Sequence, residues 1–279
     1  MQNAGIAALG LNWRYLAFEV HPDDLKSAIT GAKAMKFVGL NLTVPHKLLA
    51  LGMVDVLDET ARNWGAVNTI RFEGRAANGE WVSLGQGNFE QTAEIRSHGF
   101  NTDADAIIRS LREELDLELS DSRVLLVGTG GAGRVAALRL AAAGVKDLFL
   151  VNRTGSKAKD LAAEIRDRFP SVRAEVGYPD AEVDLVLNAT SVGLSESDVC
   201  PVDEKSFSLS NARTVYDMIY RPAETRLLKL ARAAGCRAAN GLGMLLYQGA
   251  KALEIWSGKP APVSVMRRAL EKNIYGIKG

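Results

Sequence analysis

One stretch of the chain decides the fold: Arg123-Val-Leu-Leu-Val-Gly-Thr-Gly-Gly-Ala-Gly-Arg134. Its apolar first half is too short for a helix and is typical of a strand buried in a parallel sheet. Its second half places Gly128, Gly130 and Gly133 in the order G-x-G-x-x-G, which opens the helix of a dinucleotide-binding unit. The stretch therefore predicts a strand, a glycine turn and a helix.

The three glycines have separate physical roles. The first allows a tight turn, the second lets a pyrophosphate approach the bare backbone, and the third lets helix and strand pack closely. The phosphates then lie at the helix N-terminus. We expect the dinucleotide to contact the residues of this turn, which are Gly128, Thr129, Gly130, Gly131, Ala132 and Gly133. The alternative is a glycine turn that binds nothing, which this pattern alone does not exclude.

The end of the next strand distinguishes the two nicotinamide cofactors. A site for NAD usually carries a carboxylate there, whereas an arginine accommodates the 2'-phosphate of NADP. Here the strand is followed by Asn152, Arg153 and Thr154, and Lys157 comes three residues later. A guanidinium matches a phosphate with two hydrogen bonds, and an ammonium adds a point charge. We expect NADP as the cofactor, the alternative being that both cations are solvated residues at a helix start.

Composition excludes several classes of protein. A chain of 279 residues that is 47% hydrophobic can form one or two domains with full-sized cores. The net charge of +1 argues against nucleic-acid or membrane-surface partners. We expect a cytoplasmic protein, because no long apolar run and no leader segment is recognisable. Cys200 and Cys236 have no second pair and the three histidines show no metal spacing, so we expect reduced cysteines and no metal site.

The pattern of elements divides the chain near residue 104. Before it, the sequence predicts strands at 12–20, 37–43 and 65–72 and helices at 21–36 and 48–64. This alternation indicates a smaller parallel or mixed α/β sheet. A strongly periodic helix is expected at 104–117, between the two domains. Residues 85–97 lack periodicity and are expected to form an irregular surface insertion.

The second half of the chain repeats a strand-helix pattern. Around the glycine turn, the sequence predicts a helix at 156–169 and strands at 172–176, 183–187 and 214–219. This pattern is typical of a doubly wound parallel sheet of the Rossmann type. The expected organisation is an α/β substrate-binding domain at 1–103, an NADP-binding Rossmann domain at 104–240, and C-terminal helices at 241–279 that return to the first domain.

Eight blocks of the sequence resemble the shikimate dehydrogenase family, in the family's order and along nearly the whole chain. They are Asn41-Leu-Thr-Val-Pro-His-Lys47, Gly65-Ala-Val-Asn-Thr69, Asn101-Thr-Asp103, the glycine turn, Asn152-Arg-Thr154, Asn188-Ala-Thr-Ser-Val-Gly193, Asp217-Met-Ile-Tyr-Arg-Pro222 and Gly241-Leu-Gly-Met-Leu-Leu-Tyr-Gln248. The resemblance implies reversible, NADPH-dependent reduction of 3-dehydroshikimate to shikimate. This oxidoreductase reaction is a step of the chorismate pathway to the aromatic amino acids.

Lys47 and Asp103 are suited to the proton transfer of such a reaction. Hydride transfer to a ketone develops negative charge on its oxygen, so a proton donor is needed there, and the reverse reaction needs a base. Both residues follow predicted strands, and open α/β sheets bind ligands beyond the carboxyl ends of their strands. The residues alone leave open which one relays the proton, and Asp103 could instead cap the next helix. The resemblance implies that Lys47 is the acid/base group and Asp103 its hydrogen-bonding partner.

The resemblance also assigns residues to the substrate and the cofactor. It implies substrate hydrogen bonds from Thr43, Asn68, Asp103, Tyr220 and Gln248, and a site built to bond hydroxyl groups rejects analogues that lack them. Near the cofactor it places Glu59, Thr190, Met218 and Gly241. Three alternatives stay open: Gln248 on a helix surface, Tyr220 as a packed aromatic, and Met218 in a core.

Two departures from the family pattern affect the expected activity. Met1-Gln-Asn3 aligns with the start of the family's first helix, so a preceding strand and a Ser-x-Ser pair that binds the substrate carboxylate are absent. We hypothesise an N-terminally shortened member that binds shikimate poorly. The connection between Asn68 and Asp103 is long, which could shift substrate choice toward quinate. The alternatives are a quinate-type dehydrogenase on a related hydroxylated cyclic acid and an NADP-binding protein without catalysis. The expected partner is a small molecule, for a monomer or a homodimer.

Overall fold

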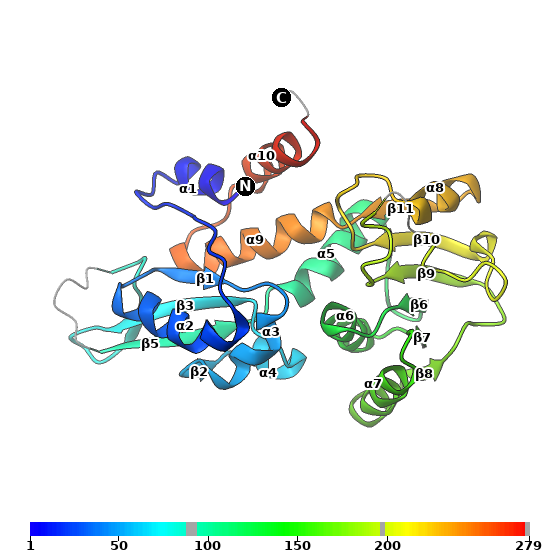
Figure 1. Cartoon of the computed structure of the whole chain (residues 1–279), viewed down its shortest axis with the longest axis horizontal. Coiled ribbons are helices and arrows are strands. Elements are labelled where there is room, and N and C mark those ends of the chain that lie inside the picture. The colour runs from blue at the N-terminus through cyan, green and yellow to red at the C-terminus, as the bar shows by residue number, and fades with distance from the viewer. Residues whose placement is uncertain (88–93, 196–198, 277–279) are drawn as a thin grey trace. The chain divides into compact units, whose positions relative to one another are not determined.

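The computed structural model describes residues 1–87, 94–195 and 199–276 and divides the chain into two compact units (Figure 1). The first unit comprises Met1–Ala104 with Leu246–Gly279, and the second comprises Asp105–Leu245. The boundary at residue 104 falls in the first turn of helix α5 (Asp103–Leu115). Among the described residues, no helix is long and apolar enough to cross a membrane.

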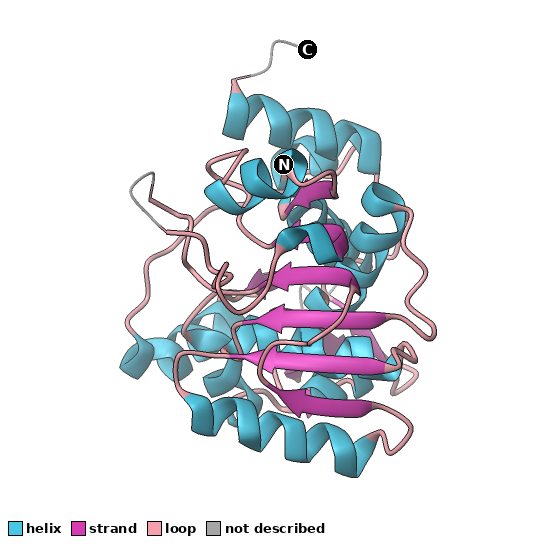
Figure 2. Cartoon of the chain, turned by 90° about the vertical axis from the view of Figure 1, so that its right-hand side faces the viewer, coloured by secondary structure: helices cyan, strands magenta, loops and turns pink. Residues whose placement is uncertain are grey.

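The second unit is built on a parallel sheet. Within its described residues the strands follow the order β11-β10-β9-β6-β7-β8, and Figure 2 shows strands of this sheet side by side. Counted from β6, this is the order 3-2-1-4-5-6 of the Rossmann fold, so the predicted fold class is confirmed. The strands are β6 (Arg123–Val127), β7 (Asp147–Val151), β8 (Arg173–Val176), β9 (Val183–Asn188), β10 (Ala212–Asp217) and β11 (Arg237–Asn240).

Helices and a 3-10 segment lie between or before these strands in the chain. They are α6 (Gly131–Ala142), α7 (Gly155–Arg168), η3 (Leu209–Asn211) and α8 (Arg226–Ala233), in addition to α5. The central strands are apolar at almost every position because both faces of a parallel sheet are covered. Leu125, Val186 and Val215 lie in one buried cluster with Leu227 and Leu228 of α8. The sequence did not predict α8 or β11, although their burial completes this core.

The first unit holds a mixed sheet in the order β1-β3-β5-β2, with β4 paired to β3. All pairings are antiparallel except β2 with β5. The strands are β1 (Gly39–Asn41), β2 (Val56–Leu57), β3 (Thr69–Arg75), β4 (Trp81–Ser83) and β5 (Ile95–Phe100). The helical segments are α1 (Gln2–Ala8), η1 (Pro22–Asp24), α2 (Leu25–Ala34), α3 (His46–Leu49), η2 (Ala50–Gly52), α4 (Glu59–Trp64), α9 (Leu242–Ser257) and α10 (Val263–Tyr275).

The core of the first unit joins segments from both ends of the chain. Leu25 and Ile29 of α2 pack with Ile70 and Phe72 of β3. Trp256 of α9 is buried, and its indole nitrogen donates a hydrogen bond to the carbonyl oxygen of Ile70 at 2.9 Å. Residues 246–276 therefore belong to this unit, and Trp256 contributes to its core.

The strand predicted at 12–20 is wrong, because residues 11–21 are irregular. The side chain of Asn3 replaces a strand partner there. Its amide oxygen accepts a hydrogen bond from the backbone nitrogen of Tyr15 at 2.7 Å, and its amide nitrogen donates to the carbonyl oxygen of Tyr15 at 2.9 Å. Backbone N–H and C=O groups need a hydrogen-bond partner, but that partner need not be another strand. The Asn3 side chain therefore satisfies the backbone of Tyr15 without strand pairing.

Two further predictions in the first unit are corrected. The helix predicted at 48–64 is interrupted by β2, after which Asp58 caps α4 by accepting a hydrogen bond from the backbone nitrogen of Thr60 at 2.9 Å. The insertion predicted at 85–97 overlaps the start of β5, and its residues 88–93 lie outside the described residues. The sequence pattern does not predict β5, because Arg96 and His98 are polar. Both side chains contact the buried Glu73 in the folded chain.

Candidate active site

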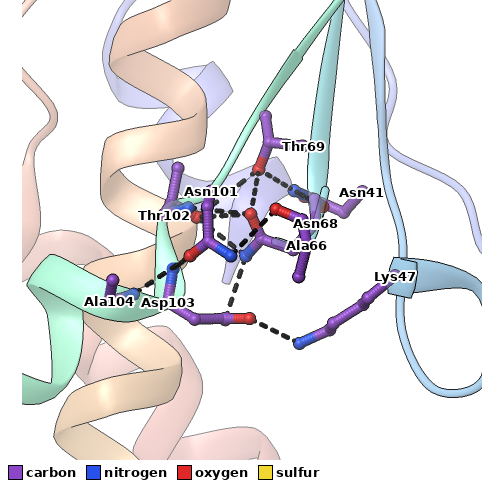
Figure 3. A network of polar contacts seen from close by, with 9 residues as sticks. All are labelled: Asn41, Lys47, Ala66, Asn68, Thr69, Asn101, Thr102, Asp103 and Ala104. Carbon is purple, nitrogen blue, oxygen red and sulfur yellow. Dashed lines mark hydrogen bonds and ion pairs between the residues drawn. The ribbon is translucent and has the colours of Figure 1, made fainter. Parts of the chain in front are cut away.

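The central feature of the first unit is an ion pair between Lys47 and Asp103 (Figure 3). Lys47 belongs to α3, and its ammonium nitrogen lies 2.7 Å from Oδ2 of Asp103, the first residue of α5. The other carboxylate oxygen accepts a hydrogen bond from the amide nitrogen of Asn68 at 2.9 Å. The Lys47 side chain is 25% exposed and that of Asp103 is 10% exposed. The pair is thus shielded from bulk water while the ammonium stays within reach of a small molecule.

The Asp103 carboxylate does not cap helix α5. Oδ1 of Asn101 accepts hydrogen bonds from the backbone nitrogens of Asp103 and Ala104, both at 3.1 Å. The amide of Asn101 also donates to the carbonyl oxygen of Ala66 at 3.0 Å. An asparagine side chain at this place satisfies the free N–H groups of the first turn. The capping alternative for Asp103 is therefore excluded, and its carboxylate is free to hold Lys47.

A buried network fixes the orientation of Asn68 (Figure 3). Its amide oxygen accepts hydrogen bonds from the backbone nitrogen of Thr102 at 2.8 Å and from the hydroxyl of Thr69 at 3.2 Å. The Thr69 hydroxyl in turn accepts one from the amide of Asn41 at 3.0 Å, and Asn41 accepts one from the hydroxyl of Tyr15 at 3.0 Å. Sequence reasoning missed these supporting residues. Asn41, Thr69 and Thr102 lie within the sequence blocks shared with the family. Their place in those blocks was the signal that could have identified them as part of the site.

The predicted substrate residues occupy both units. Thr43 is exposed in the loop before α3, Asn68 lies just before β3, and Gln248 is partly buried on α9. These three belong to the first unit, together with Lys47 and Asp103, whereas the partly exposed Tyr220 belongs to the second. Among these residues, Asn68 directly contacts the ion pair, because its amide nitrogen donates a hydrogen bond to Asp103.

The glycine turn follows β6 in the second unit and has the conformation that the sequence requires. Gly128 has a φ of +101°, which residues that carry a side chain rarely adopt. A Cβ on Gly133 would overlap the carbonyl oxygen of Gly128, so helix α6 can approach the turn only with glycine there. A Cβ on Gly130 or Gly131 would meet no atom within 4 Å. The backbone of these two residues therefore borders open space.

The polar groups around this open space fit an anionic ligand. No side chain caps helix α6, so the first N–H groups of the helix, which cannot bond within it, remain available for phosphate oxygens. The hydroxyl oxygen of Thr129 is buried and has no hydrogen-bond partner among the described residues. Asn152 orders the turn by accepting a hydrogen bond from the backbone nitrogen of Thr129 at 3.1 Å. The turn thus offers donors that a pyrophosphate would satisfy.

Arg153 and Lys157 lie where the sequence places them, between the end of β7 and the first turn of α7. Both side chains are exposed, and neither takes part in an ion pair within the described part of the chain. The amide of Asn152 donates a hydrogen bond to the carbonyl oxygen of Thr154 at 2.9 Å, which shapes the bend between them. Two cations at the end of the second Rossmann strand fit a 2'-phosphate.

Other predicted cofactor residues lie in the loops that follow the remaining strands. Thr190 comes after β9, Met218 after β10 and Gly241 after β11. Gly241 packs on Met218 so closely that a Cβ would overlap the carbonyl oxygen of Met218. Glu59 belongs to the first unit, where its exposed side chain stands at the first position of α4.

In the parts of the chain described, both cysteines are free and no group of His, Cys, Asp or Glu could hold a metal ion.

Fold and site together define a class of protein: a two-unit α/β chain with a Rossmann sheet for a dinucleotide in one unit and a lysine–aspartate pair in the unit that holds the mixed sheet. Family models agree with each part. The shikimate dehydrogenase substrate binding domain matches residues 1–70, the shikimate / quinate 5-dehydrogenase model residues 110–195, and the shikimate 5'-dehydrogenase C-terminal domain residues 241–271. The shikimate dehydrogenase (NADP(+)) of Desulforamulus reducens is 38% identical, over 98% of this chain and 90% of that protein. The chain belongs to the shikimate dehydrogenase family.

Solved structures give the same result for the fold. A shikimate dehydrogenase in complex with NADP+ is 34% identical and superposes with a TM-score of 0.80, covering 98% of this chain and 89% of that one. The ligand-free 5-ketofructose reductase of a Gluconobacter strain is also 34% identical, with a TM-score of 0.78 and coverage of 98% and 92%. The same architecture therefore serves proteins with different named substrates.

Proposed function

We propose that this chain is an NADP-dependent shikimate dehydrogenase that reversibly reduces 3-dehydroshikimate to shikimate in aromatic amino-acid biosynthesis. One observation carries the proposal: the ammonium of Lys47 lies 2.7 Å from Asp103, whose other oxygen is held by Asn68. This arrangement presents an oriented proton donor beside polar groups that can bind hydroxyls. The D. reducens protein, whose name states the same activity, supports the assignment.

Lys47 acts as the acid/base group in this proposal. When bound, NADPH supplies the hydride that reduces the 3-keto carbon. The proton that the keto oxygen then needs comes from the ammonium of Lys47, and in the oxidation direction the neutral amine takes the proton of the alcohol. Asp103 holds the ammonium in place through the 2.7 Å contact. A fixed donor avoids the cost of orienting the two groups during the reaction.

The remaining predicted residues complete the two binding sites. Thr43, Asn68, Asp103, Tyr220 and Gln248 form hydrogen bonds to the substrate, which gives selectivity because a site built to bond hydroxyl groups rejects analogues that lack them. The glycine turn binds the pyrophosphate, and Asn152, Arg153, Thr154 and Lys157 bind the 2'-phosphate end. Glu59, Thr190, Met218 and Gly241 belong to the nicotinamide end. The protein is a cytoplasmic monomer or homodimer in this proposal, which fractionation and light scattering would test.

Turnover with a small set of substrates tests the function directly. We expect shikimate to reduce NADP+, followed by the absorbance of NADPH, and quinate to do so much more slowly. Reduction of NAD+ by shikimate, and oxidation of NADPH by the ketone 5-ketofructose, should also be much slower. Faster turnover of quinate would support the quinate-type alternative, and faster turnover of 5-ketofructose would place the substrate outside the cyclic acids. Binding of NADP+ without turnover of any of the three would contradict an enzymatic role.

Arg153→Ala tests the cofactor preference. We expect the KM for NADP+ to rise at least about tenfold, the effect of losing one hydrogen bond to a charged group, while the KM for NAD+ stays unchanged because NAD+ has no 2'-phosphate. Steady-state kinetics with both cofactors gives the comparison. Arg168→Ala is the matched control, since Arg168 lies at the other end of α7 and pairs with Glu164 at 2.9 Å. An equal rise for both cofactors would refute phosphate recognition by Arg153.

A further inference from the structure

Asp217 is a buried carboxylate that the reaction does not use. It ends strand β10, its exposure is 0%, and it belongs to none of the ion pairs found among the described residues. It accepts hydrogen bonds from the hydroxyl of Thr225 at 2.6 Å, the amide of Asn188 at 2.9 Å and the backbone nitrogen of Ile219 at 3.1 Å. Burial raises the pKa of Asp217, and these three hydrogen bonds oppose that effect.

Through Asn188 the carboxylate is connected to the loop after β9. The amide oxygen of Asn188 accepts hydrogen bonds from the backbone nitrogen of Thr190 at 3.0 Å and from its hydroxyl at 2.8 Å. The same hydroxyl accepts one from the backbone nitrogen of Val192 at 3.1 Å. Asn188 is itself fully buried, and its amide nitrogen donates to Asp217 and, at 3.3 Å, to the carbonyl oxygen of Val192. The bond to Asp217 is thus the shorter of the two that fix the orientation of this amide nitrogen.

Two more loops are attached on the other side of Asp217. The bond to the Ile219 nitrogen fixes the start of the loop after β10, and the Met218 nitrogen donates to the carbonyl oxygen of Asn188 at 3.0 Å. The Ile219 carbonyl accepts a hydrogen bond from the Gly241 nitrogen at 3.2 Å, which reaches the loop after β11. The three loops follow neighbouring parallel strands, at the sheet edge where such folds bind ligands.

The burial of the Asp217 carboxylate has a cost in free energy. Burying a charge without a paired cation is costly even when hydrogen bonds satisfy it. An apolar side chain at position 217 would avoid that cost but would leave the three donors without their acceptor, and a buried donor without a partner is itself costly. What only an acceptor with two oxygens provides here is the simultaneous attachment of Thr225, Asn188 and Ile219.

We propose that Asp217 is a positioning residue that holds Thr190, Met218 and Gly241 in the spacing required by the nicotinamide half of NADP. This inference rests on the proposed function, because that function places these three residues at the nicotinamide. The adenosine half is bound elsewhere in the same unit, by the glycine turn, Arg153 and Lys157. Loss of the Asp217 bonds should therefore weaken contacts to one half of the cofactor only.

Calorimetry with two ligands tests this division. In Asp217→Asn, which keeps the side-chain shape, we expect NADP+ to bind about tenfold more weakly, the effect of weakening one charge-assisted hydrogen bond. Adenosine 2',5'-bisphosphate, which lacks the nicotinamide, should bind with unchanged affinity. The kcat for shikimate oxidation should fall by a similar factor. The ion pair of Lys47 and Asp103 should stay intact, because both residues belong to the other unit.

A matched pair at Thr225 keeps the test valid if Asp217→Asn does not fold. Thr225→Val removes the hydroxyl bonded to Asp217 and should reproduce the selective loss, whereas Thr225→Ser retains the hydroxyl and should bind both ligands normally. Equal weakening of both ligands would reduce Asp217 to a structural role and overturn the proposal, as would normal NADP+ binding by both Asp217→Asn and Thr225→Val. If the unaltered chain bound no NADP+, the proposed function would fail first and this inference with it.

Discussion

Replacing Lys47 by alanine is expected to lower kcat/KM for shikimate by about a thousandfold, the scale of a lost general acid/base group. The lysine ammonium is held by Asp103 at 2.7 Å, and within the described residues no second lysine or arginine pairs with that carboxylate. Alanine leaves the keto oxygen without an oriented proton donor. The affinity for NADP+ should stay unchanged, because the glycine turn belongs to the other unit. Steady-state kinetics and calorimetry on the same preparation measure both quantities.

Lys33→Ala is the matched control for Lys47. Lys33 belongs to the same unit and also forms a 2.7 Å ion pair with an aspartate, Asp55, but that pair lies at the surface. We expect the activity of Lys33→Ala to equal that of the unaltered chain, because exposed ion pairs contribute about 1 kcal/mol or less to stability. Turnover by Lys47→Ala within about tenfold of the unaltered chain would contradict the proposed mechanism, since general acid/base catalysis is worth more than that.

Glu73→Gln is expected to destabilise the protein by about 3 kcal/mol, the effect of removing one partner from a buried ionic cluster. Glu73 is 1% exposed on β3 and accepts hydrogen bonds from Arg71, from Arg96 at 2.6 Å and from His98 at 3.0 Å. Glutamine leaves two guanidinium groups side by side without an anion. The Arg71 guanidinium also lies over the ring of Phe100 and the Arg96 guanidinium over that of Trp81, so neither can move into water without losing packing.

Thermal unfolding measures this effect. For a chain of this size we expect the melting temperature of Glu73→Gln to fall by roughly 10 °C. Glu94→Gln is the matched control, because Glu94 pairs with Arg75 at 2.9 Å while both side chains are more than half exposed. Its melting temperature should change by about a degree or less, as for other surface pairs. An equally small change in Glu73→Gln would show that the cluster does not stabilise the unit.

The same cluster predicts a pH dependence. Burial raises the pKa of Glu73, but hydrogen bonds from His98, Arg96 and Arg71 outweigh it and lower the pKa from 4.5 to about 2. Since the unfolded chain then binds more protons than the folded one, the stabilisation is fully present above pH 4.5 and is lost as the pH falls toward 2. The difference in unfolding free energy between the unaltered chain and Glu73→Gln should therefore narrow across this range. A constant difference would contradict the assignment.

The sequence predicted the second unit better than the first. The central Rossmann strands β6, β7 and β9 are largely apolar runs that the sequence shows directly. The alternation of strands and helices then predicts the parallel sheet. Strand β5 and segment 12–20 show the opposite. Arg96 and His98 are polar yet part of a sheet because both contact the carboxylate of Glu73 on β3. The apolar residues at 12–20 form no strand, and Asn3 satisfies the backbone of Tyr15 there. Neither fact is visible in a local pattern.

By itself, the sequence determined the Rossmann class, the glycine turn, the cations at the end of β7 and the family to which the chain belongs. These are local properties, since spacing, backbone freedom and charge are written in neighbouring residues. Only the tertiary structure decided that Asn101 caps α5 while Asp103 holds Lys47, 56 positions away. The same is true of the network that attaches Asn188 and Thr225 to Asp217. The reason is physical: the orientation of a buried polar side chain depends on partners that only the folded chain brings within hydrogen-bond distance.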